Sequence, residues 1–183
     1  NRLVFSTLSA CLGEYHLGRG RRCGDRGRTR RKRNVVMLKY VSYDVVFREI
    51  PDETTLALNI SGCPHRCSGC HSPWLQSDVG QPLTDSELSA LLDHYGATIT
   101  CVCFMGGDGE PDEVARLATL IRRTTSLKVG WYSGRVALPP NFPLLLFHYI
   151  KLGPYIDRLG PLFSSTTNQR LYRITAEGAM VAF

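Results

Sequence analysis

Strand and helix patterns alternate along the chain after Met37, and this order limits the possible folds more than any other feature of the sequence. Runs that are apolar, or that alternate apolar with polar residues, predict strands at 55–61, 98–107, 127–134, 148–153 and 170–175. Two intervening segments predict helices. "TDSELSALLDHYG" has capping-box spacing between Thr84 and Glu87, and "PDEVARLATLIRRT" opens with Pro111 and two acidic residues. The order predicts an α/β fold with parallel strands, as an open sheet or a partial (βα) barrel.

Two loops are the first candidates for a functional site. In parallel α/β folds, ligands gather at the carboxyl ends of the strands. Residues 61–74 and 105–110 each follow a predicted strand and are rich in glycine and polar residues. We therefore expect these two loops to face one pocket.

"SGCPHRCSGCHS", residues 61–72, places Cys63, Cys67 and Cys70 in the spacing C-x3-C-x2-C. Structural zinc takes four protein ligands, so a zinc site would need His65 or His71 as the fourth. A [4Fe–4S] cluster held by three cysteines instead keeps one iron open. An open position is what a metal needs to bind and activate another molecule. The count of three favours a reactive cluster over one that only carries electrons.

The other cysteines indicate a reducing compartment. The chain has seven cysteines, an odd number, and no signal peptide is apparent, so we expect a cytoplasmic protein without a disulfide framework. Cys101 and Cys103 lie within an apolar run and are expected to be buried, inert thiols. No apolar run approaches the roughly 20 residues of a membrane span.

Charge divides the chain into a tail, 1–36, and a domain, 37–183. The tail holds nine arginines and one lysine against Glu14 and Asp25, and its composition predicts disorder. It could be an RNA-binding arm, a targeting segment, or a stretch without a role lying upstream of the true start at Met37, and we favour the last. The domain holds 12 basic and 14 acidic residues, so we do not expect it to bind nucleic acid.

The cysteine spacing, on a loop after the first predicted strand, resembles the radical S-adenosylmethionine superfamily. That resemblance implies a [4Fe–4S] cluster on Cys63, Cys67 and Cys70, whose open iron binds S-adenosylmethionine. One electron then cleaves the bound molecule to methionine and a 5′-deoxyadenosyl radical. "MGGD" resembles the Gly-Gly-acidic segment that lines the methionine end of the cofactor. The resemblance thus implies cofactor contacts at five positions: Gly69, His71, Gly106, Gly107 and Asp108.

A narrower resemblance covers residues 38–175. "CPHRCSGCHSP", "FMGGD", "WYSGR", "YIKLGPY" and "GPLFSSTTNQRLY" together resemble the activating proteins of anaerobic ribonucleoside-triphosphate reductases. This implies a partial (βα) barrel of radical-SAM type and a flavodoxin-type electron donor. It also implies a class III reductase as partner, on which a glycyl radical is generated. Two alternatives remain open: a radical enzyme acting on a small molecule, and a noncatalytic zinc-binding module.

Three further residues take expected roles from this comparison. In "TTNQRLY", Asn168 and Gln169 are candidates for contacts with the partner or the cofactor, although the segment could equally be a structural turn. The superfamily often stacks an aromatic residue on adenine just before the third cysteine, where this chain has Gly69. His71 or Trp74 is therefore the candidate for packing against adenine.

Overall fold

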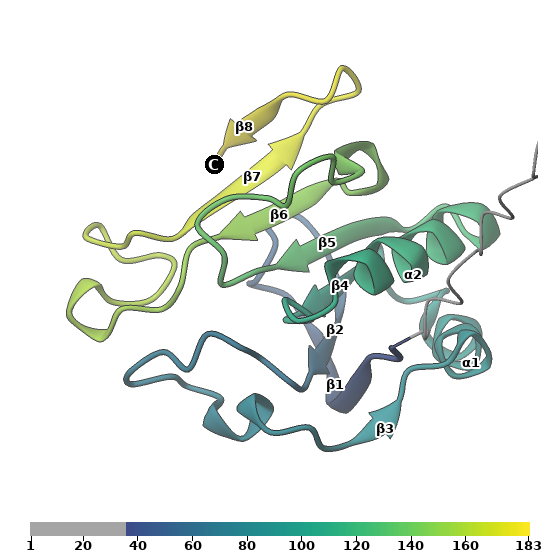
Figure 1. Cartoon of the computed structure of the whole chain (residues 1–183). Helices are drawn as coiled ribbons and strands as arrows, with labels where there is room; N and C mark the ends of the chain where they lie inside the picture. The colour runs from purple at the N-terminus through teal and green to yellow at the C-terminus, as the bar shows by residue number, and fades with distance from the viewer. Residues whose placement is uncertain (1–35) are drawn as a thin grey trace, which may run out of the picture. The chain divides into compact units, whose positions relative to one another are not determined.

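The computed structural model describes residues 36–183 (Figure 1). The expectation of a disordered, arginine-rich tail falls almost entirely on residues outside this range. The described residues form one mixed sheet and two α-helices. The strands are β1 (Lys39–Val46), β2 (Thr55–Ile60), β3 (Gln81–Pro82), β4 (Cys101–Met105), β5 (Lys128–Tyr132), β6 (Tyr149–Leu152), β7 (Arg170–Ile174) and β8 (Met180–Ala182). The helices are α1 (Asp85–Tyr95) and α2 (Pro111–Thr124), with short 3-10 helices η1 (Pro73–Gln76), η2 (Leu144–Leu146) and η3 (Asp157–Leu159).

The sheet has the order β3-β1-β2-β4-β5-β6-β7-β8 and is open, with β3 at one edge and β8 at the other. Its centre is parallel, because β2 pairs with β4, β4 with β5, and β5 with β6 in parallel register. All five predicted strands are present, and the expected parallel sheet is confirmed for β2, β4, β5 and β6. The outer pairs are antiparallel. The chain also crosses from β5 to β6 through η2 without an α-helix, so the regular strand–helix alternation ends there.

Both predicted helices are present, and each begins at the N-terminal signal seen in the sequence. The side chain of Thr84 caps α1 by accepting a hydrogen bond of 3.1 Å from the Glu87 N–H. Helix α2 begins with Pro111, which fits the first turn because its missing N–H has no partner there. Its last turn carries Arg122 and Arg123, which favour the negative end of the helix dipole.

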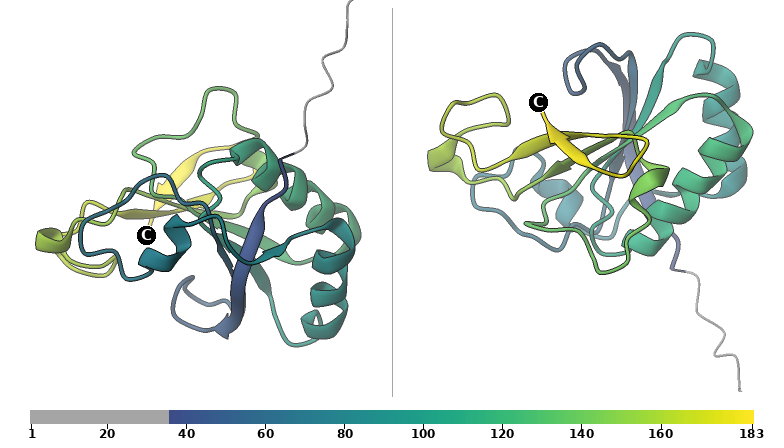
Figure 2. Two further views of the ribbon diagram at one scale, coloured as in Figure 1. Left: turned by 60° about the horizontal axis from the view of Figure 1, so that its bottom comes forward. Right: turned by 90° about the horizontal axis from the view of Figure 1, so that it is seen from above.

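Both helices cover the same face of the sheet (Figure 2). The core on that face includes Leu58, Phe104 and Trp131, which are fully buried with the apolar sides of α1 and α2. The opposite face has a smaller cluster of Ile50, Cys101, Cys103, Tyr149 and Leu171. Cys101 and Cys103 are both fully buried, so the prediction of buried thiols is confirmed. Burial raises the pKa of each thiol well above its ordinary value, which keeps both sulfurs protonated and inert.

Within residues 36–183, neither helix combines the length and the apolar character needed to cross a membrane.

Candidate metal centre

The cysteine loop begins directly after β2, at the carboxyl end of a strand in the parallel part of the sheet (Figure 1). Its first residues are fixed by backbone hydrogen bonds from the Gly62 N–H to the Ser77 oxygen at 3.1 Å and from the Cys63 N–H to the Leu75 oxygen at 2.9 Å. Leu75 is buried and belongs to η1, so the loop closes on its own short helix. This closure anchors the first thiol while the middle of the loop faces solvent.

The three thiols are partly exposed and free. The Ser72 N–H points to the Cys70 sulfur at 3.4 Å, and the Cys70 N–H to the Cys67 oxygen at 3.3 Å. Burial raises the pKa of the Cys63 thiol, and the charges of Asp108, Cys67 and Cys70 raise it further. A backbone hydrogen bond from His65 lowers this pKa but does not offset the rise. Clustered thiolates that accept N–H groups suit an iron–sulfur cluster, so the donor set fits one.

The thiols nevertheless stand apart in this conformation. Among residues 36–183, no group of three His, Cys, Asp or Glu side chains lies close enough together to hold a metal ion. A cluster on Cys63, Cys67 and Cys70 therefore requires the loop to draw its sulfurs inward. Three of the loop's residues between 62 and 69 have a positive φ: Gly62, Arg66 and Gly69. Such irregular backbone is typical of a loop shaped around a ligand.

The glycine turn after β4 lies against the cysteine loop, as expected. Gly106 and Gly107 have φ angles of 108° and 85°, which side chains rarely allow. A Cβ on Gly107 would come within 2.6 Å of the Val114 side chain, so glycine is required there. A cavity of about 190 Å³ is lined by residues of both loops, including Gly62, Gly107 and Gly109. The prediction that the two loops face one pocket is confirmed.

Asp108, in the acidic place of the glycine segment, is almost fully buried, with 1% of its surface exposed. Its carboxylate accepts hydrogen bonds from the Ser133 hydroxyl at 2.5 Å and the Gly134 N–H at 2.9 Å. Two cationic or ionisable side chains also approach it, His65 at 3.2 Å and Arg135 at 3.7 Å. Asp108 thus joins the glycine turn, the end of β5 and the cysteine loop.

The other expected cofactor contacts lie on the exposed side of the loop. Gly69 has a φ of 71°, and a Cβ there would lie 3.1 Å from the Asp157 side chain, so the loop packs closely on η3. The His71 ring lies 4.6 Å from the ring of Tyr155, centre to centre. Trp74 is 56% exposed and belongs to η1. Both candidates for packing against adenine are therefore at the surface.

The segment 166–172 closes against the loop that follows β6. The Asn168 amide donates to the Pro154 oxygen at 2.9 Å, and Gln169 is buried. Asn168 Oδ1 is buried and has no hydrogen-bond partner among the described residues. The hydrogen bond from the Asn168 amide supports the interpretation of this segment as a structural turn.

Lys151 is a site residue that the sequence analysis missed. It lies on β6 and is 9% exposed, and its ammonium donates to the Gly153 oxygen at 2.9 Å. Burial lowers the pKa of Lys151 to about 8, although the charges of Asp108, Cys67, Cys103 and Cys63 act in the opposite direction. The signal was present, because a lysine inside the apolar strand "YIKL" is rarely buried without a reason.

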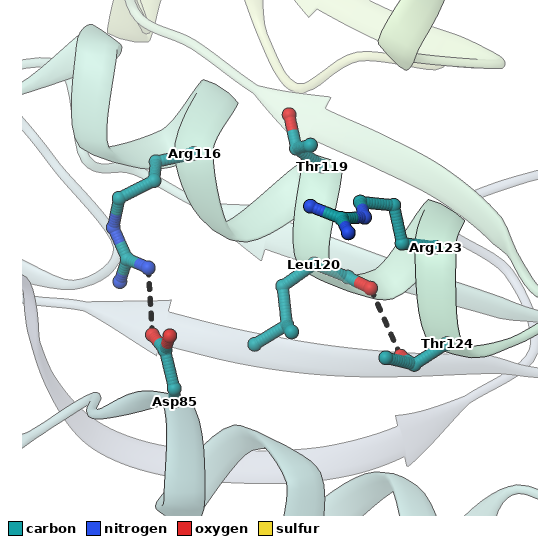
Figure 3. A pocket seen from close by; sticks show the side chains of 6 residues that line it. All are labelled: Asp85, Arg116, Thr119, Leu120, Arg123 and Thr124. Atoms are coloured by element: carbon teal, nitrogen blue, oxygen red, sulfur yellow. Dashed lines mark hydrogen bonds and ion pairs between the residues drawn. The ribbon is translucent and has the colours of Figure 1, made fainter.

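Another cavity, of about 480 Å³, lies on α2 and the start of α1 (Figure 3). Four of its five polar side chains already have partners. Arg116 pairs with Asp85 at 2.7 Å and with Glu113, and the Thr119 and Thr124 hydroxyls bond to the backbone of their own helix. None of the expected site residues lines it, so this cavity is not a candidate for the metal centre.

Among residues 36–183, the two histidines outside these loops behave as structural residues. His148 Nδ1 accepts the Val129 N–H at 3.0 Å, and its Nε2 lies 2.6 Å from the Arg122 guanidinium. Burial lowers the pKa of His148, and the nearby Arg122 and Lys128 lower it further. His94, on the last turn of α1, packs edge-on against the ring of Tyr95.

Comparison with known proteins supports the metal assignment. A family model described as a 4Fe-4S single cluster domain matches residues 54–135, which include the three cysteines and the glycine turn. No curated protein and no solved structure matches the chain. The family match favours a [4Fe–4S] cluster over zinc as the cofactor, and it indicates an iron–sulfur protein.

Proposed function

We propose that this protein is a radical S-adenosylmethionine activating enzyme that generates the glycyl radical of a class III anaerobic ribonucleoside-triphosphate reductase. The observation that carries the proposal is the juxtaposition of two loops. Three cysteines follow one strand of the parallel sheet, and a glycine turn follows the neighbouring strand and lies against the loop that carries them, at Gly62 and His65. Three thiolates leave one iron of a [4Fe–4S] cluster open, and the glycine turn offers backbone groups to whatever binds there.

Cys63, Cys67 and Cys70 would hold the cluster. Bound there, it would supply one electron for the cleavage of S-adenosylmethionine to methionine and a 5′-deoxyadenosyl radical. The chain itself binds and orients the reactants. No acid–base pair is required, and hydrogen abstraction from a glycine Cα needs only positioning and exclusion of water.

The glycine turn is suited to bind the methionine end of the cofactor through its backbone. The Gly106 carbonyl and N–H are already bonded to Trp131 and Tyr132. The N–H groups of Gly107 and Asp108 make no hydrogen bond to a described residue. N–H donors suit a carboxylate, so we assign these two groups to the cofactor's carboxylate. Gly69 and His71 would line the other side of the same site.

The partner assignment follows from the size and openness of the domain. Residues 36–183 form an open sheet with a parallel centre, and a loop of a second protein can approach its strand ends. A protein substrate with a target glycine suits this arrangement better than an enclosed metabolite. We further propose a flavodoxin-type donor and a cytoplasmic location, since both cluster and glycyl radical need reducing, anaerobic conditions.

The first experiment is anaerobic reconstitution followed by reduction with S-adenosylmethionine present. The proposal predicts about four irons and four sulfides per chain, the content of one [4Fe–4S] cluster. It also predicts release of 5′-deoxyadenosine and methionine in equal amounts. Stoichiometric zinc without iron, or a cluster that never cleaves S-adenosylmethionine, would contradict it.

A further inference from the structure

The carboxylate of Asp108 already accepts hydrogen bonds from other residues of the chain. It is 1% exposed and accepts the Ser133 hydroxyl and the Gly134 N–H at hydrogen-bond distance. The Arg135 guanidinium donates to the Asp108 carbonyl at 2.6 Å, so the backbone of the residue is held as well. A carboxylate with this many internal partners is fixed in place and points into the protein.

His65 brings the cysteine loop to this carboxylate. The residue stands between the first and second cysteines, and its Nε2 lies 3.2 Å from Asp108 Oδ2. The two atoms are at ion-pair distance but are not aligned as a hydrogen bond, and Nε2 has no other partner among the described residues. A buried donor without a hydrogen bond is costly, so a small movement that aligns this pair is favourable.

Gly134 makes room for the His65 ring. A Cβ at position 134 would lie 2.5 Å from His65 Cδ2 and 3.0 Å from Nε2, closer than atoms can approach. Gly134 does not have a positive φ, so its backbone alone does not require glycine. The absence of a side chain at this position is explained by the histidine that packs on it.

We infer that Asp108, His65 and Gly134 form a lock that positions the cysteine loop around its cluster. The inference rests on the cysteine-held cluster of the proposed function. It assigns the Asp108 carboxylate to the loop and leaves only the Asp108 N–H for the cofactor. The thiols must move together to hold a cluster, and this same movement of the loop would align His65 Nε2 with Asp108. His65 and Asp108 are thus positioning residues, acting on the cluster through Cys63 and Cys67.

The test measures how fast the reconstituted cluster is lost to an iron chelator under anaerobic conditions, without S-adenosylmethionine. His65→Leu removes the donor, His65→Gln keeps an amide donor near the position of Nε2, and Gly134→Ala displaces the ring without changing any polar group. Gly109→Ala is the matched control, because its Cβ would meet only the Gly62 oxygen at an ordinary 3.5 Å.

The lock predicts about tenfold faster cluster loss in His65→Leu and in Gly134→Ala, as for other residues that orient metal ligands. His65→Gln should recover most of the wild-type rate, and the EPR spectrum of the reduced cluster should change in His65→Leu but not in Gly109→Ala. The double variant His65→Leu/Gly134→Ala should lose its cluster no faster than His65→Leu alone, because His65→Leu has already removed the donor that Gly134→Ala displaces.

Wild-type rates in His65→Leu and Gly134→Ala would overturn the lock, as would effects that multiply in the double variant. Thermal unfolding of each apoprotein distinguishes a loosened loop from a damaged fold. If His65→Leu does not fold, the comparison of cluster loss between Gly134→Ala and Gly109→Ala still tests the lock. A protein that keeps its cluster in this assay but never cleaves S-adenosylmethionine would contradict the proposed function and not the lock.

Discussion

The indole Nε1 of Trp131 donates a hydrogen bond of 2.7 Å to the carbonyl oxygen of Gly106. Trp131 is fully buried on β5, and Gly106 opens the glycine turn at the end of the neighbouring strand β4. The turn has two consecutive residues with positive φ, a conformation that needs support from the surrounding structure. One buried side chain therefore links the hydrophobic core to the candidate cofactor site.

Trp131→Phe should loosen the glycine turn. It removes the donor to Gly106 and leaves a cavity in the core, so we expect the free energy of unfolding to fall by about 2–3 kcal/mol. Cleavage of S-adenosylmethionine should fall further than cluster content, because the turn lies beside the cluster and does not hold it. Phe147→Leu is the control, since Phe147 packs in the same cluster without bonding to the turn. Equal losses of cleavage in both variants would contradict this role.

The cysteines should separate into two classes. Alanine at Cys63, Cys67 or Cys70 should abolish cluster binding, measured as iron per chain after reconstitution. Alanine at both Cys101 and Cys103 should leave the iron content unchanged and lower the free energy of unfolding by about 1–3 kcal/mol, because both thiols are fully buried core groups. Loss of iron only in the second variant would place the cluster on β4 and refute the site.

Glu53 should stabilise the fold at neutral pH. Burial raises the pKa of Glu53, but hydrogen bonds from Lys128, Thr100 and Tyr149 outweigh it, so the pKa is lowered below 4.5 overall. A lowered carboxyl pKa gives stability that is present above pH 4.5 and lost as the pH falls through the folded value. Glu53→Gln should therefore be less stable than the wild type by about 2 kcal/mol at pH 7, with the difference shrinking towards pH 3.

Urea denaturation at the two pH values measures this difference. A gap between wild type and Glu53→Gln that stays constant from pH 7 to pH 3 would show that the carboxylate charge contributes nothing. Iron content should be unchanged, because Glu53 precedes β2 and its partners stand at the starts of β5 and β6, at the end of the strands opposite the cysteine loop.

Lys151 should give a dependence of the same sign at higher pH. Its pKa falls from 10.5 to about 8 on folding, because burial disfavours the charged ammonium. Between these values the unfolded chain binds more protons than the folded protein, so the stability of the wild type rises with pH there. Lys151→Met lacks this rise, and its stability relative to the wild type should fall by about 2 kcal/mol from pH 7 to pH 10. The cysteines titrate in both proteins, so their contribution cancels in the difference between the two free energies of unfolding. A reductant is needed throughout the measurement.

Local signals explain what could be predicted of the fold. The capping box at Thr84 and the proline at 111 act within one turn of their helices, and both helices begin where those signals stand. The apolar runs of β4 and β5 reflect burial on both faces of a parallel strand. Strands β1, β3 and β8 were not predicted, because at least half of the residues in each are exposed and the strands exist by pairing with β2, β1 and β7.

The candidate site could be predicted only in part. The cysteine spacing and the paired glycines are contiguous motifs, and the sheet places their loops side by side. The partners of Asp108 are His65, which lies 43 residues before it, and Ser133 to Arg135, which lie 25 to 27 residues after it. No local sequence pattern predicts these contacts. Lys151 did carry a local signal, as a lysine within an apolar strand, but its carbonyl partner Ser133 belongs to the neighbouring strand's loop and has no local pattern that predicts it.

The central claim is that the protein places a radical on a glycine of a partner reductase. The direct measurement is EPR spectroscopy of an anaerobic mixture of this protein, a class III reductase, S-adenosylmethionine and a reductant. The account predicts a glycyl-radical doublet that collapses to a singlet when the reductase is made with Cα-deuterated glycine, because the splitting comes from that hydrogen. Cleavage of S-adenosylmethionine without any doublet, in the presence of a competent reductase, would contradict the account and favour a small-molecule substrate.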